Sequence, residues 1–290
     1  MDSVALALVL ISAASHAAWN YAAKNAGDKD SFLLLMNLTS QVTILPVFLL
    51  TLKEWGLPMI VLPMIILSAI AEAVYFLSLS RAYEQGDLSV VYPVVRSSPL
   101  FVAAAGALFL GERITLVGII GIVFILLGVY VLHIKKLERR RILEPLRSFR
   151  GPAFRFAILA ALGTTIYSLS DKVGVSTIDP FLYAFWLEIF ISAILIPIVI
   201  FRRGWRAISF EWDKSKRNIS ISGVLMRGGY LLMLLAMVVA PVGYLLALRQ
   251  VSVVIGALIG VVLLGEGYGA PRLLGSVSIF VGIYMIAVFA

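Results

Sequence analysis

The sequence predicts an all-α polytopic membrane protein with ten transmembrane helices, arranged as two inverted repeats of five helices. Three observations lead to this prediction. Apolar residues make up 61% of the chain and charged residues only 14%, whereas a soluble domain carries about a quarter charged residues. The apolar residues form runs of about 20, the length that crosses a bilayer as a helix. Finally, part of the first half of the chain recurs in the second half.

Ten apolar runs predict the helices, and most of the connections between them are short. A membrane β-barrel is excluded, because it needs segments of about 10 residues with alternating polarity. Two connections are long and basic, and the first divides the chain into repeats 1–133 and 153–290 with a linker at 134–152. This linker is either a solvated connection or an amphipathic segment on the membrane surface. The predicted spans are 3–23, 31–52, 59–80, 88–110, 115–133, 153–174, 180–201, 218–240, 242–264 and 270–289, with the second basic connection at 202–217.

Composition narrows the classes of function. The chain has no cysteine, which excludes disulfides, thiolate metal sites and cysteine nucleophiles. The net charge of +8 is explained by basic residues beside membrane helices rather than by a nucleic-acid partner. The first apolar run lacks a basic lead, so we interpret it as a membrane helix of a multi-pass protein of the cytoplasmic (inner) membrane and not as a signal peptide.

The repeat is visible in "LFLGER" at 108–113 and "LLGEG" at 263–267. A shift of 154 aligns 98–130 with 252–284 and gives 11 identities without a gap, four of them glycines. Each half has an odd number of helices, so the second half enters the membrane from the opposite face. Such inverted repeats are a common basis of secondary transport by alternating access.

Two five-helix halves, the repeated "LGE", "VVYPVVRSSPLF" and "LALRQVSVVIGALIG" together resemble the drug/metabolite transporter (DMT) superfamily, EamA family. This resemblance covers essentially the whole chain. It implies a secondary carrier, often an exporter, of small metabolites such as amino acids or other carboxylate-bearing compounds, driven by a proton or cation gradient. No cofactor is expected, and the chain has no P-loop for ATP. The alternatives are a membrane-embedded enzyme, for which no catalytic motif is visible, and a non-transporting receptor or scaffold.

Several residues have a structural interpretation. Gly256 and Gly260 form a GxxxG that favours close helix packing. In the repeated "LGE" the glycine is expected to end a helix, and Glu112 and Glu266 are expected near the interface. Pro93 and Pro99 lie in one predicted span and indicate either a passive kink or a gating hinge.

Polar residues inside the spans are candidates for substrate binding, since such residues are costly in lipid and normally face a cavity or a partner. Arg96 and Arg249 lie in the equivalent fourth and ninth spans; they either line a cavity or pair with Glu112 and Glu266. His16 is either a packed core residue or a ligand of substrate, and a metal site is not expected because His133 is far along the chain. The substrate-binding candidates are His16, Trp19, Asn20, Tyr75, Tyr92, Arg96, Tyr167, Ser168 and Arg249.

Acidic residues inside the predicted spans are the candidates for energy coupling. Glu72 lies near the middle of the third span, and the shift of 154 places it one position from Arg227. The two are predicted to meet across the pseudo-two-fold axis, either as a static pair or as a site where Glu72 takes up a proton or cation. Glu188 is the second candidate acid.

Basic residues also predict the orientation. The connections that follow the odd-numbered spans carry 17 Lys and Arg, whereas the opposite side carries Lys53, Arg113 and Lys172. The positive-inside rule therefore predicts that both termini lie outside. An alkaline phosphatase fused to the C-terminus is expected to be active and a fluorescent protein inactive there; the reverse pattern would contradict the orientation.

Overall fold

The computed structural model describes residues 2–24, 26–51, 53, 55–85, 91, 94–132, 151–255, 258 and 270–289. Six residues considered above lie outside this described part of the chain: Tyr92, Pro93, His133, Gly256, Gly260 and Glu266.

Throughout the described residues, the regular structure is helical and no strand occurs, as the composition predicts. Six helices are long and apolar enough to cross a membrane: α1, α2, α3, α9, α10 and α13. The others are shorter apolar helices. The bounds are α1 (Ser3–Lys24), α2 (Lys29–Thr51), α3 (Leu62–Gln85), α5 (Ser98–Phe109), α6 (Leu116–Leu132), α9 (Pro152–Thr177), α10 (Pro180–Val239), α11 (Val242–Leu248) and α13 (Ala270–Phe289).

The long helix α10 contains a break at Gly204, which has φ 75° and ψ 156°. Glycine tolerates this positive φ because it has no Cβ. The segment 202–217, predicted as a connection, is instead helical on both sides of the break. The stretch 205–217 contains no proline and no further glycine. It is held to the α1–α2 connection, where the Glu211 carboxylate accepts the N–H of Asp28 at 2.9 Å.

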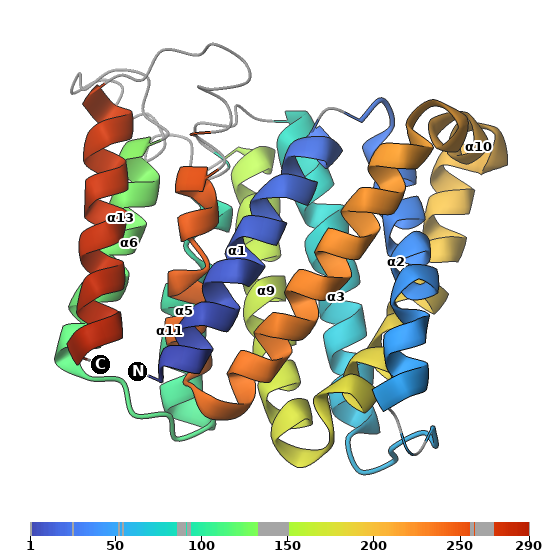
Figure 1. Cartoon of the computed structure of the whole chain (residues 1–290). Coiled ribbons are helices and arrows are strands. Elements are labelled where there is room, and N and C mark those ends of the chain that lie inside the picture. The colour runs from blue at the N-terminus through green and yellow to red at the C-terminus, as the bar shows by residue number, and fades with distance from the viewer. Residues whose placement is uncertain are drawn as a thin grey trace.

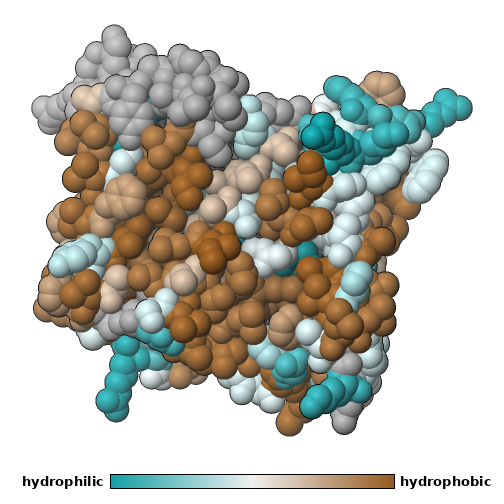
Figure 2. Space-filling model, viewed as in Figure 1, coloured by the Kyte–Doolittle hydropathy of each residue, from teal (hydrophilic) through white to brown (hydrophobic). Residues whose placement is uncertain are grey.

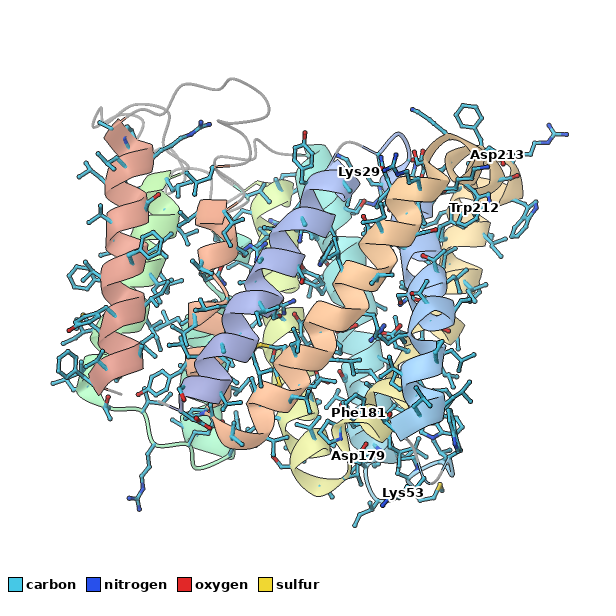
Figure 3. The ribbon with its side chains drawn as sticks, in the orientation of Figure 1. Lys29, Lys53, Asp179, Phe181, Trp212 and Asp213 are labelled. Carbon is cyan, nitrogen blue, oxygen red and sulfur yellow. The ribbon has the colours of Figure 1, made fainter. Side chains whose placement is uncertain are left out.

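The polar and apolar surfaces form bands. Figure 2 shows a broad brown band between teal groups at two opposite edges, the pattern of a membrane-spanning surface. Lys29, Trp212 and Asp213 lie at one edge and Lys53, Asp179 and Phe181 at the other (Figure 3). We call the edge with Lys29 and 202–217 the basic edge. Both chain ends lie toward the opposite edge (Figure 1), which we call the termini edge.

Helices α6 and α13 lie side by side (Figure 1) and touch through glycines that the repeat relates. A Cβ at Gly128 would lie 2.5 Å from the carbonyl oxygen of Gly275, and one at Gly121 would lie 3.0 Å from that of Gly282. The shift of 154 turns Gly121 into Gly275 and Gly128 into Gly282, so it exchanges the two contacts. Such mutual exchange is the signature of a two-fold interface.

Two further observations agree with this pseudo-two-fold relation. The Ser278 hydroxyl donates to the carbonyl oxygen of Phe124 at 2.7 Å, and these positions are 154 residues apart. A residue that touches its own equivalent lies beside the axis. The second observation concerns two glycine contacts. A Cβ at Gly229 would lie 3.0 Å from the Cβ of Ser15, and one at Gly163 would lie 3.3 Å from Tyr75. Gly163 is equivalent to Ser15 under the shift of 148, and Gly229 is equivalent to Tyr75 under the shift of 154, so the repeat exchanges these two contacts.

The repeated Leu-Gly-Glu has a defined role in its first copy. Gly111 ends α5 with φ +66°, the left-handed conformation that favours glycine at helix ends. The chain then folds back, and the Glu112 carboxylate accepts the N–H of Val242 at 2.9 Å. A carboxylate is stabilising at a helix N-terminus, so the first repeat caps α11 of the second. Glu112 thus serves a structural role, as expected.

The spans that contain Arg96 and Arg249 are interrupted within one residue of equivalent places. The N–H of Ser97 bonds to the carbonyl of Val94, and that of Gln250 to the carbonyl of Ala247, in both cases three residues back. Helix α5 begins after the first turn, with Pro99 in its first turn, where proline needs no donor. Pro99 therefore lies in the first turn of a helix, directly after an interruption of the span. Whether this interruption is a passive kink or a gating hinge stays a prediction.

We expect Gly128→Ala to lower the free energy of unfolding by about 1–3 kcal/mol, because the new methyl group overpacks the contact with Gly275. Gly228→Ala is the matched control, since a Cβ at Gly228 meets nothing within 4 Å. The control is expected to be neutral or to stabilise by up to about 1 kcal/mol, as alanine favours the helix. Denaturant unfolding in detergent compares the two, and equal effects would contradict the close approach.

Candidate functional site

A cavity lies among α1, α2, α3, α9 and α10, and Arg249, which follows α11, also lines it. It encloses about 890 Å³ of empty space, including the open solvent at its mouth. Its wall combines apolar residues with charged, amide and aromatic ones. The polar and aromatic members are His16, Trp19, Asp30, Asn37, Glu72, Tyr75, Phe76, Tyr167, Glu188, Arg227, Tyr230 and Arg249.

His16 lies between two guanidinium groups. Arg96 Nη2 is 3.1 Å from Nε2 of the imidazole, and Arg249 Nη2 is 3.2 Å from Nδ1. A guanidinium only donates hydrogen bonds, and a neutral imidazole has one acceptor nitrogen. The ring can therefore satisfy only one of the two arginines at a time, and the other donor is directed at an N–H. In addition, Arg249 Nε is buried and bonds to none of the described residues.

The orientation of the imidazole is fixed by its neighbours. Trp19 packs edge-on against it with ring centroids 4.9 Å apart. Tyr75 and Tyr167, which also line the cavity, form a similar pair with centroids 6.0 Å apart. The arginines thus meet His16 within an aromatic wall. Glu112, one of their expected partners, instead caps α11, and Glu266 is not described.

Arg227 forms a buried ion pair with Glu188, both in α10. This differs from the expected partner, Glu72, because the break at Gly204 folds α10 back on itself and brings Arg227 to Glu188. The Asn37 amide donates to the second carboxylate oxygen of Glu188 at 2.8 Å. Gln41 and Ser192 complete this network through the Asn37 carbonyl oxygen. The Glu188 charge is therefore held by one cation and one amide.

Glu72 is the eleventh of the 24 residues of α3 and lines the cavity near the middle of the molecule. It makes no salt bridge within the described chain, but Arg227, Arg249 and Asp171 all act on it electrostatically. The carboxylate thus lies between the two arginine sites and faces the cavity.

Ion pairs hold the basic edge beside the cavity. Asp30, at the start of α2, accepts from Arg203 Nε at 2.8 Å and lies 3.4 Å from Arg202. Ser80 of α3 also donates to Asp30, at 3.1 Å. These contacts join α2, α3 and the bend of α10, so they close one end of the cavity wall.

Hydroxyl groups surround a further buried acid, Asp171. The buried Asp171 of α9 accepts from Ser68 of α3 and from Tyr183 and Tyr230 of α10. The neighbouring Lys172 donates to the carbonyls of Met237 and Ala240 at the C-terminal end of α10. A helix C-terminus is a favourable place for a cation.

The structure brings most of the candidate residues together. His16, Trp19, Tyr75, Tyr167, Arg249, Glu72, Glu188 and Arg227 line one cavity, and Arg96 reaches it through His16. Asn20 and Ser168 are outside the lining: the Asn20 amide donates to the His16 carbonyl at 2.7 Å, and Ser168 is fully buried. Their roles in binding stay predictions, and Tyr92 is not described.

Sequence reasoning missed Asp30, Asn37 and Tyr230 in the wall and Asp171 beneath it. Asn37 and Tyr230 are polar groups within apolar runs, and that signal could have identified them. Asp30 and Asp171 stand near the ends of apolar runs beside lysines, where charged residues are common, so only the fold distinguishes them from interfacial residues.

The sequence model of the EamA-like transporter family matches residues 3–134 and again 152–288. No curated protein matches the sequence. A solved structure, described only as "Crystal structure of protein", superposes with a TM-score of 0.75 at 14% identity and covers 98% of this chain and 99% of its own. That likeness concerns the fold alone. Because the family matches in both halves and spans most of the sequence, the chain belongs to the EamA-like transporter family, as the sequence motifs predict.

Proposed function

We propose that the chain is a secondary transporter of small metabolites that carry a carboxylate or another anionic group, such as amino acids. The observation that carries this proposal is the position of His16 between Arg96 and Arg249. One imidazole cannot accept from both guanidiniums at once. An anionic group beside it would accept from Arg249, whose Nε bonds to none of the described residues. Carboxylates suit guanidiniums because they accept two parallel hydrogen bonds.

The acidic groups of the same cavity suit a zwitterion. Glu72 faces the cavity without a salt bridge among the described residues, whereas Glu188 is paired with Arg227. A substrate with an ammonium group would lie with that group toward Glu72 and its carboxylate toward Arg249. The aromatic rings of Trp19, Tyr75 and Tyr167 offer an apolar surface for the body of the substrate.

Alternating access between the two repeats is the proposed mechanism. It is supported by the exchangeable glycine contacts of α6 and α13 and by the breaks beside Arg96 and Arg249, since broken helices commonly line transport sites. We propose ten spans, with α10 contributing one on each side of its bend. We further propose export across the inner membrane, with both termini outside.

Glu72 is the proposed coupling acid, with Glu188 second. The distinction rests on their partners. Protonating Glu188 would leave the buried Arg227 without its partner, which costs several kcal/mol. Glu72 has no such constraint among the described residues, so it can exchange a proton or cation with the cavity.

We expect Arg96→Gln to raise the half-saturating concentration of the transported anion or zwitterion by about 10- to 100-fold, as one charge-assisted hydrogen bond is lost. Proteoliposome counterflow of labelled amino acids, monocarboxylates and organic amines measures the effect. Arg155→Gln is the matched control, because Arg155 is exposed on α9 and should leave counterflow unchanged. Unaltered counterflow in Arg96→Gln would assign Arg96 a structural role, and counterflow of none of these compounds by the wild-type protein would contradict the proposed function.

We expect Glu72→Gln to abolish accumulation driven by a pH gradient, because the amide cannot carry a proton between the two states. Substrate exchange should survive, with weaker binding of substrates whose ammonium group lies toward this position. Uptake with and without an imposed gradient separates the two activities. If the variant still accumulates substrate against its gradient in response to pH, Glu72 is not the coupling residue.

A further inference from the structure

Asp171 is a buried acid with an environment unlike that of its neighbours. Its side chain is fully buried in α9, and no salt bridge joins it to a described residue. Three hydroxyl groups donate to it: Ser68 at 2.5 Å and Tyr183 at 2.9 Å to one oxygen, and Tyr230 at 2.6 Å to the other. The carboxylate is therefore held by hydroxyl groups on two other helices, α3 and α10.

This environment permits a change of protonation. A hydroxyl group both donates and accepts, so each of the three can rotate to receive a proton from a neutral Asp171. The buried acids Asp30 and Glu188 differ, since each is paired with arginine and a proton there would leave a cation alone. Asp171 can thus become neutral without breaking an ion pair of the described chain.

Other ionisable groups surround the cluster. Tyr183 and Tyr230 face Asp171 from α10, Glu72 acts on it from α3, and Tyr167 acts on it from its own helix. The ammonium of Lys172 is directed to backbone carbonyls of α10. The nearest charge of the same sign therefore belongs to Glu72, on the cavity side.

Tyr230 is the connection between this cluster and the cavity. Its ring lines the cavity wall together with Glu72, and its hydroxyl bonds to Asp171. Tyr183 donates to the same carboxylate but is fully buried and outside the lining. Of these two tyrosines, only Tyr230 offers a proton a path from the cavity.

We propose that Asp171 is a proton-binding site connected to the transport cavity by Tyr230, an inference that rests on the proposed gradient-driven transport. A proton from water or a carboxylic acid in the cavity adds to Tyr230 Oη as the phenolic proton passes to Asp171 Oδ2. Tyr230 is neutral before and after the step, the cavity group loses one proton and Asp171 gains one.

The same step acts on the closure of the cavity. Ionised Asp171 joins α9 to α3 and to the parts of α10 on both sides of its break at Gly204. It does so through charge-assisted hydrogen bonds, which are stronger than neutral ones. Neutral Asp171 holds these helices less firmly on the side away from the basic edge. Uptake of a proton from the cavity thus favours opening toward the termini edge, where the proton is released.

Infrared spectroscopy of the full chain in nanodiscs tests the proton site without any substrate. We expect the wild type to show a carboxyl C=O band that titrates with pH, and Asp171→Asn to lack one component of it. Glu72→Gln is the comparison variant and should retain that component. A spectrum of Asp171→Asn that titrates as the wild type does would overturn the proposal, whatever the outcome of the transport assays.

Two tyrosine variants test the path and do not depend on the folding of Asp171→Asn. Tyr230→Phe should slow protonation of the Asp171 band after a pH jump by about 100-fold, the usual contribution of a positioned proton carrier. Tyr183→Phe removes an equivalent hydroxyl from the same carboxylate and should leave the rate within about a factor of three, the ordinary scatter between related variants. Equal slowing in both variants, or in neither, would contradict the role of Tyr230.

Discussion

A charge inside the apolar band is costly unless the protein supplies a partner, and this constraint organises the interior of the molecule. Arg227 is neutralised by Glu188, and Asp30 by Arg202 and Arg203. Asp171 is stabilised instead by three hydroxyl donors. The cluster of His16, Arg96 and Arg249 is organised differently, because one imidazole lies between two guanidinium groups. Two cations of this cavity thus approach each other without an acid between them among the contacts described above.

This arrangement separates charges that hold the structure from charges that can act. Paired groups such as Glu188 and Arg227 resist change, since removing one partner strands the other. Glu72 and Asp171 have no arginine partner of this kind among the described residues; Glu72 lines the cavity, and Asp171 lies beneath its wall. Substrate and proton can thus alter the electrostatics of the cavity while the Glu188–Arg227 pair stays intact.

The sequence predicted the helical class, the repeat and most of the polar and aromatic residues of the cavity wall, because a polar side chain in an apolar run has few places to lie. It did not predict which charges pair. The partner of Arg227 depends on the bend at Gly204, and a single glycine in a basic segment gave no sign of it. The interrupted spans were foreseen only as kinks at prolines, whereas the break beside Arg249 has no proline and is visible only in the backbone hydrogen bonds. Asp171 escaped notice because its partners come from helices far apart in the sequence.

The exchangeable contact between α6 and α13 has a consequence for how tightly the halves must adhere. It is the kind of interface that two identical subunits would form, yet here both sides belong to one chain. A covalent connection of this kind holds partners at an effective concentration of the order of millimolar. Because one chain keeps the halves together, this interface does not have to hold free subunits on its own, although side chains such as Ile125 and Ile279 pack beside the glycines. The proposed rocking of the two halves would therefore proceed without their separation.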